Sequence, residues 1–287
     1  MKQCVLILLL MPTLVLAQND KGRDYHLDKE FNVNLGGQVR LRCSDADVVV
    51  VGSSRSTAHV KIDRTVTTRG WVWGDETFSV DISNEDGNLD IRERANGTVS
   101  MAFGSYHERY TILLELPLGM SLSVDGDDGD YQISSLHGAI RLDLDDADVV
   151  LEKCQGNSFS FRLDDGDVQM DEGRGSLTVD GDDADIRIRN ARFASMDVNI
   201  NDGDFVVETS LADAGRYNID LQDGLVSLTV TSGGGRFDIR HDDARVVTEG
   251  AFSVINRTET RTEVSTTNGS AEVRIQADDA RVKLVRI

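Results

Sequence analysis

Apolar and polar residues alternate in a short motif that occurs five times between Ser121 and Asp204. Each copy runs apolar, any residue, apolar, two polar residues, a small residue, Asp, apolar, any residue, apolar, as residues 142–151 show in full. Apolar residues two apart indicate β-strands, because side chains alternate between the two faces of a strand. The small and acidic residues between them predict a turn. The central small residues, 18, 19, 18 and 19 positions apart, are Gly129, Ala147, Gly166, Ala184 and Gly203.

A turn-centred unit of about 19 residues predicts a solenoid, because one coil is too small to bury its apolar face and stacked coils bury a continuous core. Each copy also has a second break, such as Gly156 or Gly175, which predicts two strands per coil. The predicted fold is therefore all-β: a parallel, β-helix-like solenoid over residues 117–287, with a less regular β region or cap over residues 18–116. The predicted core positions are Leu144, Leu163, Val168, Ile186, Ile200 and Phe205.

The regions on either side of the five motifs follow the pattern less closely. Residues 41–50 and 82–91 fit the motif, with gaps of about two coils around them, so irregular coils or hairpins are expected in between. Residues 96–109 lack alternation and are expected to form a loop. After Asp204 the motif continues with drift, and we expect parallel coils of about 19 residues as far as Val246.

Two tryptophans and two cysteines leave alternatives open. Trp71 and Trp73 lie two apart on one face of a predicted strand, where they either cap the end of the stack or form an aromatic platform for a ligand. Cys43 occupies an inward strand position, and Cys154 lies in the opposite turn of a different coil. They form either a disulfide, which an exported protein permits, or two separate thiols with Cys43 as a core residue.

The first 17 residues have the features of a secretory signal peptide. Lys2 supplies the positive start, an apolar run follows from Val5 to Leu10, and Ala17 ends a small-residue cleavage site. A membrane anchor is the alternative, but the apolar run is too short to span a bilayer comfortably. We therefore expect export to the periplasm, the cell surface or the extracellular space, with no membrane span after cleavage.

The charge of the chain excludes some partners. There are 30 Lys and Arg against 50 Asp and Glu, a net charge of −20. Removing Lys2 with the leader leaves 29 basic residues against the same 50 acidic ones, a net charge of −21. Such a surface repels nucleic-acid phosphates and anionic lipid, so neither is an expected partner.

The Asp before each small centre has a structural interpretation. The parity of the preceding strand points this residue toward the inner corner, where its carboxylate could accept a backbone hydrogen bond in an Asx-turn. Because Ala often replaces Gly at the centre, the sequence predicts crowding at a stacked corner rather than a required positive φ. The residues in this position are Asp45, Asp86, Asp128, Asp146, Asp165, Asp183, Asp202, Asp223, Asp243 and Asp279.

The Asp residues two before and one after the centre should point outward. Parallel strands stack about 4.8 Å apart, so these carboxylates would form ladders of like charge. Solvent and salt could screen the repulsion, which gives a solvated acidic edge, or Ca²⁺ could bind between the rungs. The acidic turn occurs once per coil, unlike the calcium-binding nonapeptide solenoids. The candidate calcium ligands are Asp145, Asp148, Asp164, Asp167, Asp182 and Asp185.

No catalytic constellation is evident in the sequence. The five histidines are scattered, with no metal-ligand spacing and no paired nucleophile motif. Pectin-lyase-like enzymes also use parallel β-helices, but their coils are larger and carry long active-site loops. No cofactor is required by this pattern, apart from the candidate calcium.

The motifs resemble those of a known family. A Leu-Pro-x-Gly lead-in at residues 116–119 is followed by Gly129–Asp130 and by Asp-Val steps at residues 148–149 and 167–168. This series resembles the bacterial exported "putative adhesin" domains of unknown function over roughly residues 31–287. The resemblance implies a β-solenoid at the cell envelope and offers no catalytic residues. The expected function is a non-enzymatic envelope scaffold or adhesion module that binds an envelope protein or a glycan; the alternative is a carbohydrate-active enzyme on a parallel β-helix.

Overall fold

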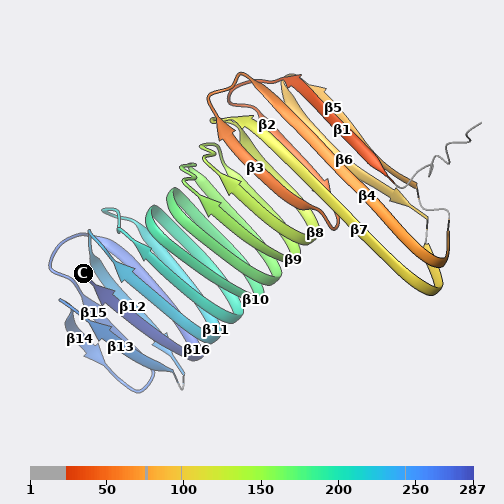
Figure 1. Ribbon diagram of the computed structural model, residues 1–287. Coiled ribbons are helices and arrows are strands. Elements are labelled where there is room, and N and C mark those ends of the chain that lie inside the picture. The colour runs from red at the N-terminus through yellow and green to blue at the C-terminus, as the bar shows by residue number, and fades with distance from the viewer. Residues whose placement is uncertain (1–23, 75–76, 98, 243) are drawn as a thin grey trace, which may run out of the picture.

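The computed structural model describes residues 24–74, 77–97, 99–242 and 244–287, and this part of the chain is built from strands alone (Figure 1). No described segment is a helix long and apolar enough to cross a membrane. The strands are β1 (Tyr25–Asn32), β2 (Gln38–Cys43), β3 (Asp47–Ser53), β4 (Thr57–Gly74), β5 (Thr77–Glu85), β6 (Asn88–Asn96), β7 (Val99–Pro117), β8 (Ser121–Ser134), β9 (Ile140–Glu152), β10 (Ser158–Thr209), β11 (Arg216–Val230), β12 (Gly235–His241), β13 (Arg245–Glu249), β14 (Ser253–Arg257), β15 (Arg261–Ser265) and β16 (Ala271–Arg286).

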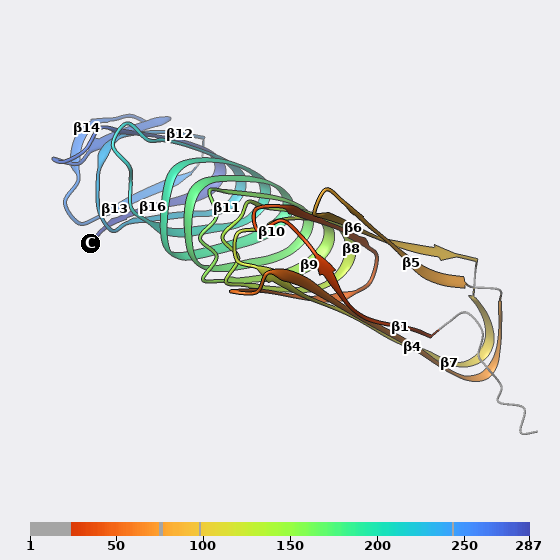
Figure 2. The ribbon, with the colours of Figure 1, turned by 90° about the horizontal axis from the view of Figure 1, so that it is seen from above.

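The predicted parallel solenoid is confirmed. Leu144 of β9 pairs with Leu163 of β10, and Val149 pairs with Val168, so consecutive coils are 19 residues apart. The two predicted strands of a coil are the two halves of one bent strand, because β8, β9, β11 and β16 run without interruption through the acidic turn. We call this turn the acidic corner, the halves before it the first wall and the halves after it the second wall. Figure 2 shows the successive coils as stacked rings.

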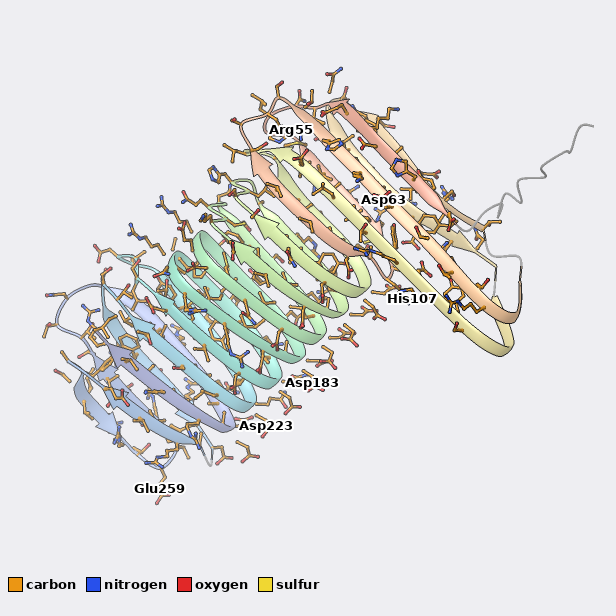
Figure 3. The ribbon with its side chains drawn as sticks, viewed as in Figure 1. Arg55, Asp63, His107, Asp183, Asp223 and Glu259 are labelled. Atoms are coloured by element: carbon orange, nitrogen blue, oxygen red, sulfur yellow. The ribbon has the colours of Figure 1, made fainter. Side chains whose placement is uncertain are left out.

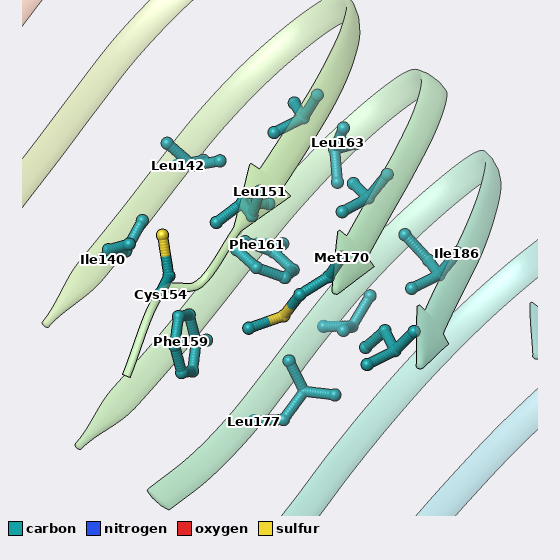
Figure 4. Close-up of a cluster of buried hydrophobic side chains, with 14 of the residues drawn as sticks. Ile140, Leu142, Leu151, Cys154, Phe159, Phe161, Leu163, Met170, Leu177 and Ile186 are labelled. Atoms are coloured by element: carbon teal, nitrogen blue, oxygen red, sulfur yellow. The ribbon is translucent and has the colours of Figure 1, made fainter. Parts of the chain in front are cut away.

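The core lies between the two walls. All six predicted core positions are buried, and in Figure 4 side chains from neighbouring coils, among them Phe159, Phe161 and Met170, fill the interior. The rings of Phe159 and Phe161 lie 6.3 Å apart, and Phe159 also contacts Phe193 of a later coil edge-on at 6.2 Å. Aromatic contacts of this kind link one coil to the next.

The corner opposite the acidic one contains residues in the left-handed region that are not glycine. Ser135, Lys153, Glu172 and Asn190 have φ values of 56°, 54°, 67° and 55°. They are 18, 19 and 18 residues apart, so the same backbone geometry recurs in each coil. Positive φ is uncommon outside glycine, and the stacking of the neighbouring coils holds these residues there.

Two antiparallel hairpins extend the N-terminal end of the stack. β2 and β3 form the first coil and pair directly with β8, and between them and β8 the chain forms the β4–β7 and β5–β6 hairpins. The expectation of a loop over residues 96–109 is wrong at Asn96, which ends β6, and from Val99 on, because β7 starts there and pairs with β4. Alternation is weak there because the hairpin projects beyond the core (Figure 2). Asp86 and Gly87 also form no solenoid corner: both have positive φ, 50° and 73°, as a two-residue hairpin turn requires.

The coils at the C-terminal end are not stacked in chain order. β11 pairs with the last strand, β16, and β16 in turn pairs with β12 and β13. The expectation of consecutive coils as far as Val246 is therefore wrong after β11: the strand at 271–286 lies between the coils of residues 216–230 and 235–249. The antiparallel strands β15 and β14 then cover the edge of β12.

Candidate functional site

Two outward residues in succession bend each strand at the acidic corner. In β9, Leu142 and Leu144 are buried, Asp145 and Asp146 are both exposed, and burial resumes at Ala147. The prediction that the Asp before the centre faces inward is therefore wrong, because the inward parity shifts by one residue at the corner, as at a β-bulge. Asp183 and Asp223 project away from the stack along one long edge (Figure 3). The same position is exposed in Asp45, Asp128, Asp146, Asp165, Asp183, Asp202, Asp223 and Asp279, while Asp243 lies outside the described residues.

These exposed side chains form no Asx-turn. Among the described residues, none of them accepts a hydrogen bond from the backbone two residues on. The carboxylates that do bind backbone belong to the position after the centre. Asp148 Oδ1 accepts a hydrogen bond from the backbone N–H of Asp167 at 3.2 Å, and Asp185 Oδ1 accepts one from that of Asp204 at 2.8 Å. Each of these bonds joins one coil to the next.

Glycine and alanine centres have different backbone conformations. Gly129, Gly166 and Gly203 have φ values of 123°, 114° and 135°, whereas the alanine centres do not lie in the positive region. A Cβ on Gly166 would lie 2.3 Å from the carbonyl oxygen of Ala147. The sequence interpretation was therefore right about crowding and wrong about φ at the glycine positions.

The candidate calcium ligands lie in two outward rows. In the row after the centre, Arg187 lies between Asp185 and Asp167, with Nη–Oδ distances of 2.6 and 3.6 Å. Burial and the neighbouring charge of Asp185 raise the pKa of Asp167, and Arg187 opposes this. In the row before the centre, Asp145, Asp164 and Asp182 are exposed, and Asn201 donates a hydrogen bond to Asp182.

Neither row forms a metal cage in the described part of the chain. Across residues 24–74, 77–97, 99–242 and 244–287, no three His, Cys, Asp or Glu side chains converge in a way that could hold a metal ion. Bound calcium would have to bridge neighbouring rungs, with one carboxylate from each. Calcium binding at the acidic corner thus stays a prediction.

Cys43 and Cys154 are buried free thiols. Cys43 is a core residue, as one of the two sequence alternatives predicted, and its Sγ lies 3.8 Å from the hydroxyl of Tyr131. Burial raises the pKa of the Cys43 thiol to about 12, so it is protonated and unreactive at neutral pH. The side chains of Trp71 and Trp73 lie outside the described residues, so their role stays a prediction.

A hydrogen-bond network around His59 connects β1, β4 and β7. His59 Nδ1 is 2.7 Å from Glu115 and its Nε2 is 2.8 Å from Asp28. These hydrogen bonds, first to Asp28 and then to Glu115, raise the pKa of His59. Because a carboxylate holds each ring nitrogen, the imidazole is not placed to accept a proton from a nucleophile.

A polar groove of about 610 Å³ crosses the first wall near its C-terminal end. It runs across four neighbouring rungs, from the last coil of β10 through β11 and β16 to β12. Two register rows line it. The first row contains Asp197, Asn218, Arg274 and Asp238, and the second contains Asn199, Asp220, Gln276 and Arg240.

The lengths of the side chains explain the hollow. Asp197, Asn218 and Asp220 are short, and the next rungs carry the longer Arg274 and Arg240. Sequence reasoning missed this groove because outward positions follow no pattern. The short and long side chains become neighbours only through the insertion of β16 beside β11. The signal for the groove in the sequence was a set of outward polar residues with no opposite charge at the same position of the adjoining coil.

A family model described as Toastrack DUF4097 matches residues 38–284 of the chain. The chain belongs to this family. The match confirms the resemblance to a family of domains of unknown function, and it runs from the first coil at β2 into β16. The Toastrack region therefore includes the acidic corner and the groove. No curated protein matches the chain.

Two solved structures are similar to this Toastrack chain. One is a "putative adhesin" from Bacteroides fragilis NCTC 9343, 10% identical, with 91% of this chain and 97% of that chain covered and a TM-score of 0.49. The other is a "putative cell adhesion protein" from Clostridium sporogenes ATCC 15579, 12% identical, with 92% of this chain and 100% of that chain covered and a TM-score of 0.26. Likeness at this level says nothing about the ligands of this chain.

Proposed function

We propose that this Toastrack chain is an exported, non-enzymatic β-solenoid that acts as an adhesion or scaffold module of the cell envelope. The observation that carries the proposal is the continuous stack of coils, whose polar side chains lie on open walls and along one corner. Stacked repeats create extended surfaces of this kind, which suit the binding of large partners. The leader-like residues 1–17 support the export part of the proposal, and they lie outside the described residues.

The arrangement of the polar groups favours binding over catalysis. Enzymes that hydrolyse glycosides place two carboxyl groups on either side of the scissile bond, in a site closed around the sugar. The groove is lined by strands of one wall, and no loop is among its lining residues. Both ring nitrogens of His59 are hydrogen-bonded to carboxylates.

The proposal is tested by localisation and by retention. The full chain, tagged at its C-terminus, should be found outside the cytoplasm of a bacterial host after loss of the leader, and a chain lacking residues 1–17 should stay in the cytoplasm. Purified residues 18–287 on beads should retain isolated cell-envelope fragments saturably, whereas beads carrying the heat-unfolded chain should not. A cytoplasmic full chain, or equal retention by both beads, would refute the proposal.

The enzymatic alternative has its own measurement. Soluble polysaccharides incubated with the purified chain should release no more reducing ends than the same polysaccharides incubated with a chain carrying Asp197→Asn and Asp220→Asn. Release that depends on these two carboxylates would replace the binding function with a hydrolytic one.

A further inference from the structure

The groove on the first wall contains polar side chains without partners beside others that are paired, because Arg261 binds Asp238 and Arg274 lies 3.4 Å from Glu272. Toward the N-terminal end, the outward rows of this wall contain ion pairs between coils: Arg42 lies 3.8 Å from Asp125, and Arg162 lies 4.0 Å from Asp143 and 3.5 Å from Asp180. In the groove, the side chains of Asp197, Asn218, Asp220, Gln276 and Arg240 make no hydrogen bond or ion pair with any described residue. These groups are close neighbours in the register, yet all are left open to a ligand.

The mixture of groups selects the chemistry of that ligand. A carboxylate only accepts hydrogen bonds, a guanidinium only donates them, and the amides of Asn and Gln do both. A cationic ligand would pair with Asp197 and Asp220 but would be repelled by Arg240. An anionic ligand would pair with Arg240 but would be repelled by the two aspartates. A hydroxyl group donates and accepts without charge, so a ligand rich in hydroxyl groups can satisfy every group in the groove.

The geometry of the groove selects a polymer. Its lining repeats at each rung, about 4.8 Å apart, and this step is close to the length of one sugar ring in an extended polysaccharide. We propose that the groove binds an extended, uncharged polysaccharide lying along the solenoid axis, held by Asp197, Asn218, Asp220, Gln276 and Arg240. This inference rests on the proposed adhesion function and names its partner class.

Two further observations agree with a ligand at this place. Partial burial in the groove, and then the charge of Asp278, raise the pKa of Asp220, so a hydroxyl donor at Asp220 would restore a favourable contact for the carboxylate. The volume of about 610 Å³ lies within the usual range of ligand sites, about 300–1,000 Å³. No aromatic ring is among the lining residues, so binding to a short oligosaccharide should be weak and should strengthen with the length of the polymer.

The test uses native gels that contain a soluble polysaccharide, in which a binding protein is retarded in proportion to its affinity. Residues 18–287 carry a net charge of −21 and should migrate well. The probes are dextran, laminarin and mannan, with a chitin hexasaccharide as a competitor in solution and an oligolysine peptide as the cationic comparison. The variant carries Asn218→Ala with Asp220→Ala. The matched control carries Ser123→Ala with Asp125→Ala, which are in the same two register rows on β8, outside the groove.

We expect at least one neutral polysaccharide to retard the wild-type chain, with an apparent Kd at least tenfold higher for the groove variant and unchanged for the control. The single variant Arg240→Gln should weaken retardation to a smaller degree. The inference is overturned if no neutral polysaccharide retards the wild-type chain, if the groove variant is retarded as strongly as the wild type, or if oligolysine alone binds through Asp220. Should the groove variant bind polysaccharide as strongly as the wild type while the beads still retain envelope fragments, the groove assignment fails and the adhesion function stands.

Discussion

At the acidic corner, glycine and alanine occupy the same place in the motif but adopt different backbone conformations. Gly166 has a φ of 114°, and its Cα faces the carbonyl of Ala147 on the preceding coil. The N–H of the next residue, Asp167, then reaches the carboxylate of Asp148 on that coil. The ladder between β9 and β10 lacks residue pairs at this point, so this side chain supplies an inter-coil hydrogen bond where the backbone does not.

Substitution of the glycine centres should therefore be asymmetric. Gly166→Ala introduces a Cβ 2.3 Å from a carbonyl oxygen in a backbone region that alanine rarely adopts. We expect a loss of about 1–3 kcal/mol in the free energy of unfolding, measured with urea. The reverse change, Ala147→Gly, removes no required conformation and should cost about 0.5–1 kcal/mol. Equal losses for the two variants would show that the corner does not distinguish the residues.

Calcium at the acidic corner is a second prediction at this scale. In the row after the centre, Arg187 pairs with Asp185 and lies near Asp167. Asp148 accepts a hydrogen bond from the backbone N–H of Asp167. We therefore place any calcium in the other row, between Asp145, Asp164 and Asp182. Extracellular calcium sites often have a Kd of about 10⁻⁴–10⁻³ M, so a few millimolar would add about 1–2 kcal/mol per site.

The measurement compares thermal midpoints with calcium, magnesium and chelator at about 0.15 M salt, because monovalent ions also screen the ladder. Calcium should raise the midpoint above magnesium, and Asp164→Asn should remove the difference. Identical midpoints in all three solutions would leave this edge as a solvated acidic face.

At the scale of single elements, alternation predicted the buried side chains well. Leu144 and Val168 lie within regular stretches of strand, where period two and burial agree. Parity could not locate the shift at the corner, because Asp145 and Asp146 are chemically identical and either could be the additional outward residue. The hairpin of β4 and β7 was harder still: it is held by backbone pairing beyond the core, and its side chains need not alternate.

The β1–β4–β7 hairpin layer should respond to pH through His59. Its pKa is raised, so its contribution to stability is complete below the ordinary value of about 6.5 and is lost as the pH rises through the folded value. Hydrogen bonding to one ring nitrogen of His59 lowers the pKa of Asp28, and hydrogen bonding to the other, together with Arg55, lowers the pKa of Glu115. Their contribution is complete above about pH 4.3 and is lost as the pH falls through the folded values.

The network is thus complete between roughly pH 4.5 and 6.5. An NMR titration of the His59 ring should give a midpoint above 6.5, and Asp28→Asn should lower it. His107→Gln, an exposed change on the same hairpin, is the control and should leave the His59 midpoint unchanged. A midpoint of His59 at or below 6.5 would contradict the contacts described.

At the scale of the whole molecule, charge is distributed unevenly along the stack. Residues 118–234 contain 8 Lys and Arg against 25 Asp and Glu, a net charge of −17, whereas residues 235–287 contain 9 of each. The central coils therefore repel one another's acidic edges, and the C-terminal end does not. The groove lies at the boundary, where strands from both regions interleave.

The order of coils at that boundary could not be predicted from the sequence. The motif determines which side chains of a coil face the core. It does not determine which coil stacks next to it. β11, β12 and β16 present similar apolar inner faces, so any of them could stack on another. The groove could not be predicted for the same reason: Arg274 and Gln276 lie beside Asn218 and Asp220 only because β16 is inserted beside β11.

Engineered disulfides can test this order directly. Ser227 of β11 is the register partner of Lys283 in β16, and Lys283 is also the partner of Val247 in β13. Adjacent parallel strands are about 4.8 Å apart, within the Cα separation of about 4.4–6.8 Å that a disulfide accepts. A separation of two rungs, about 9.6 Å, exceeds this limit.

Two double variants should therefore form disulfides on mild oxidation, as read by non-reducing peptide mass spectrometry: Ser227→Cys with Lys283→Cys, and Val247→Cys with Lys283→Cys. Ser227→Cys with Val247→Cys should remain reduced, because β16 separates the two strands. The native Cys43 and Cys154 are buried and should not interfere. A stack in chain order would give the opposite result, with the 227–247 pair oxidised and the 227–283 pair free.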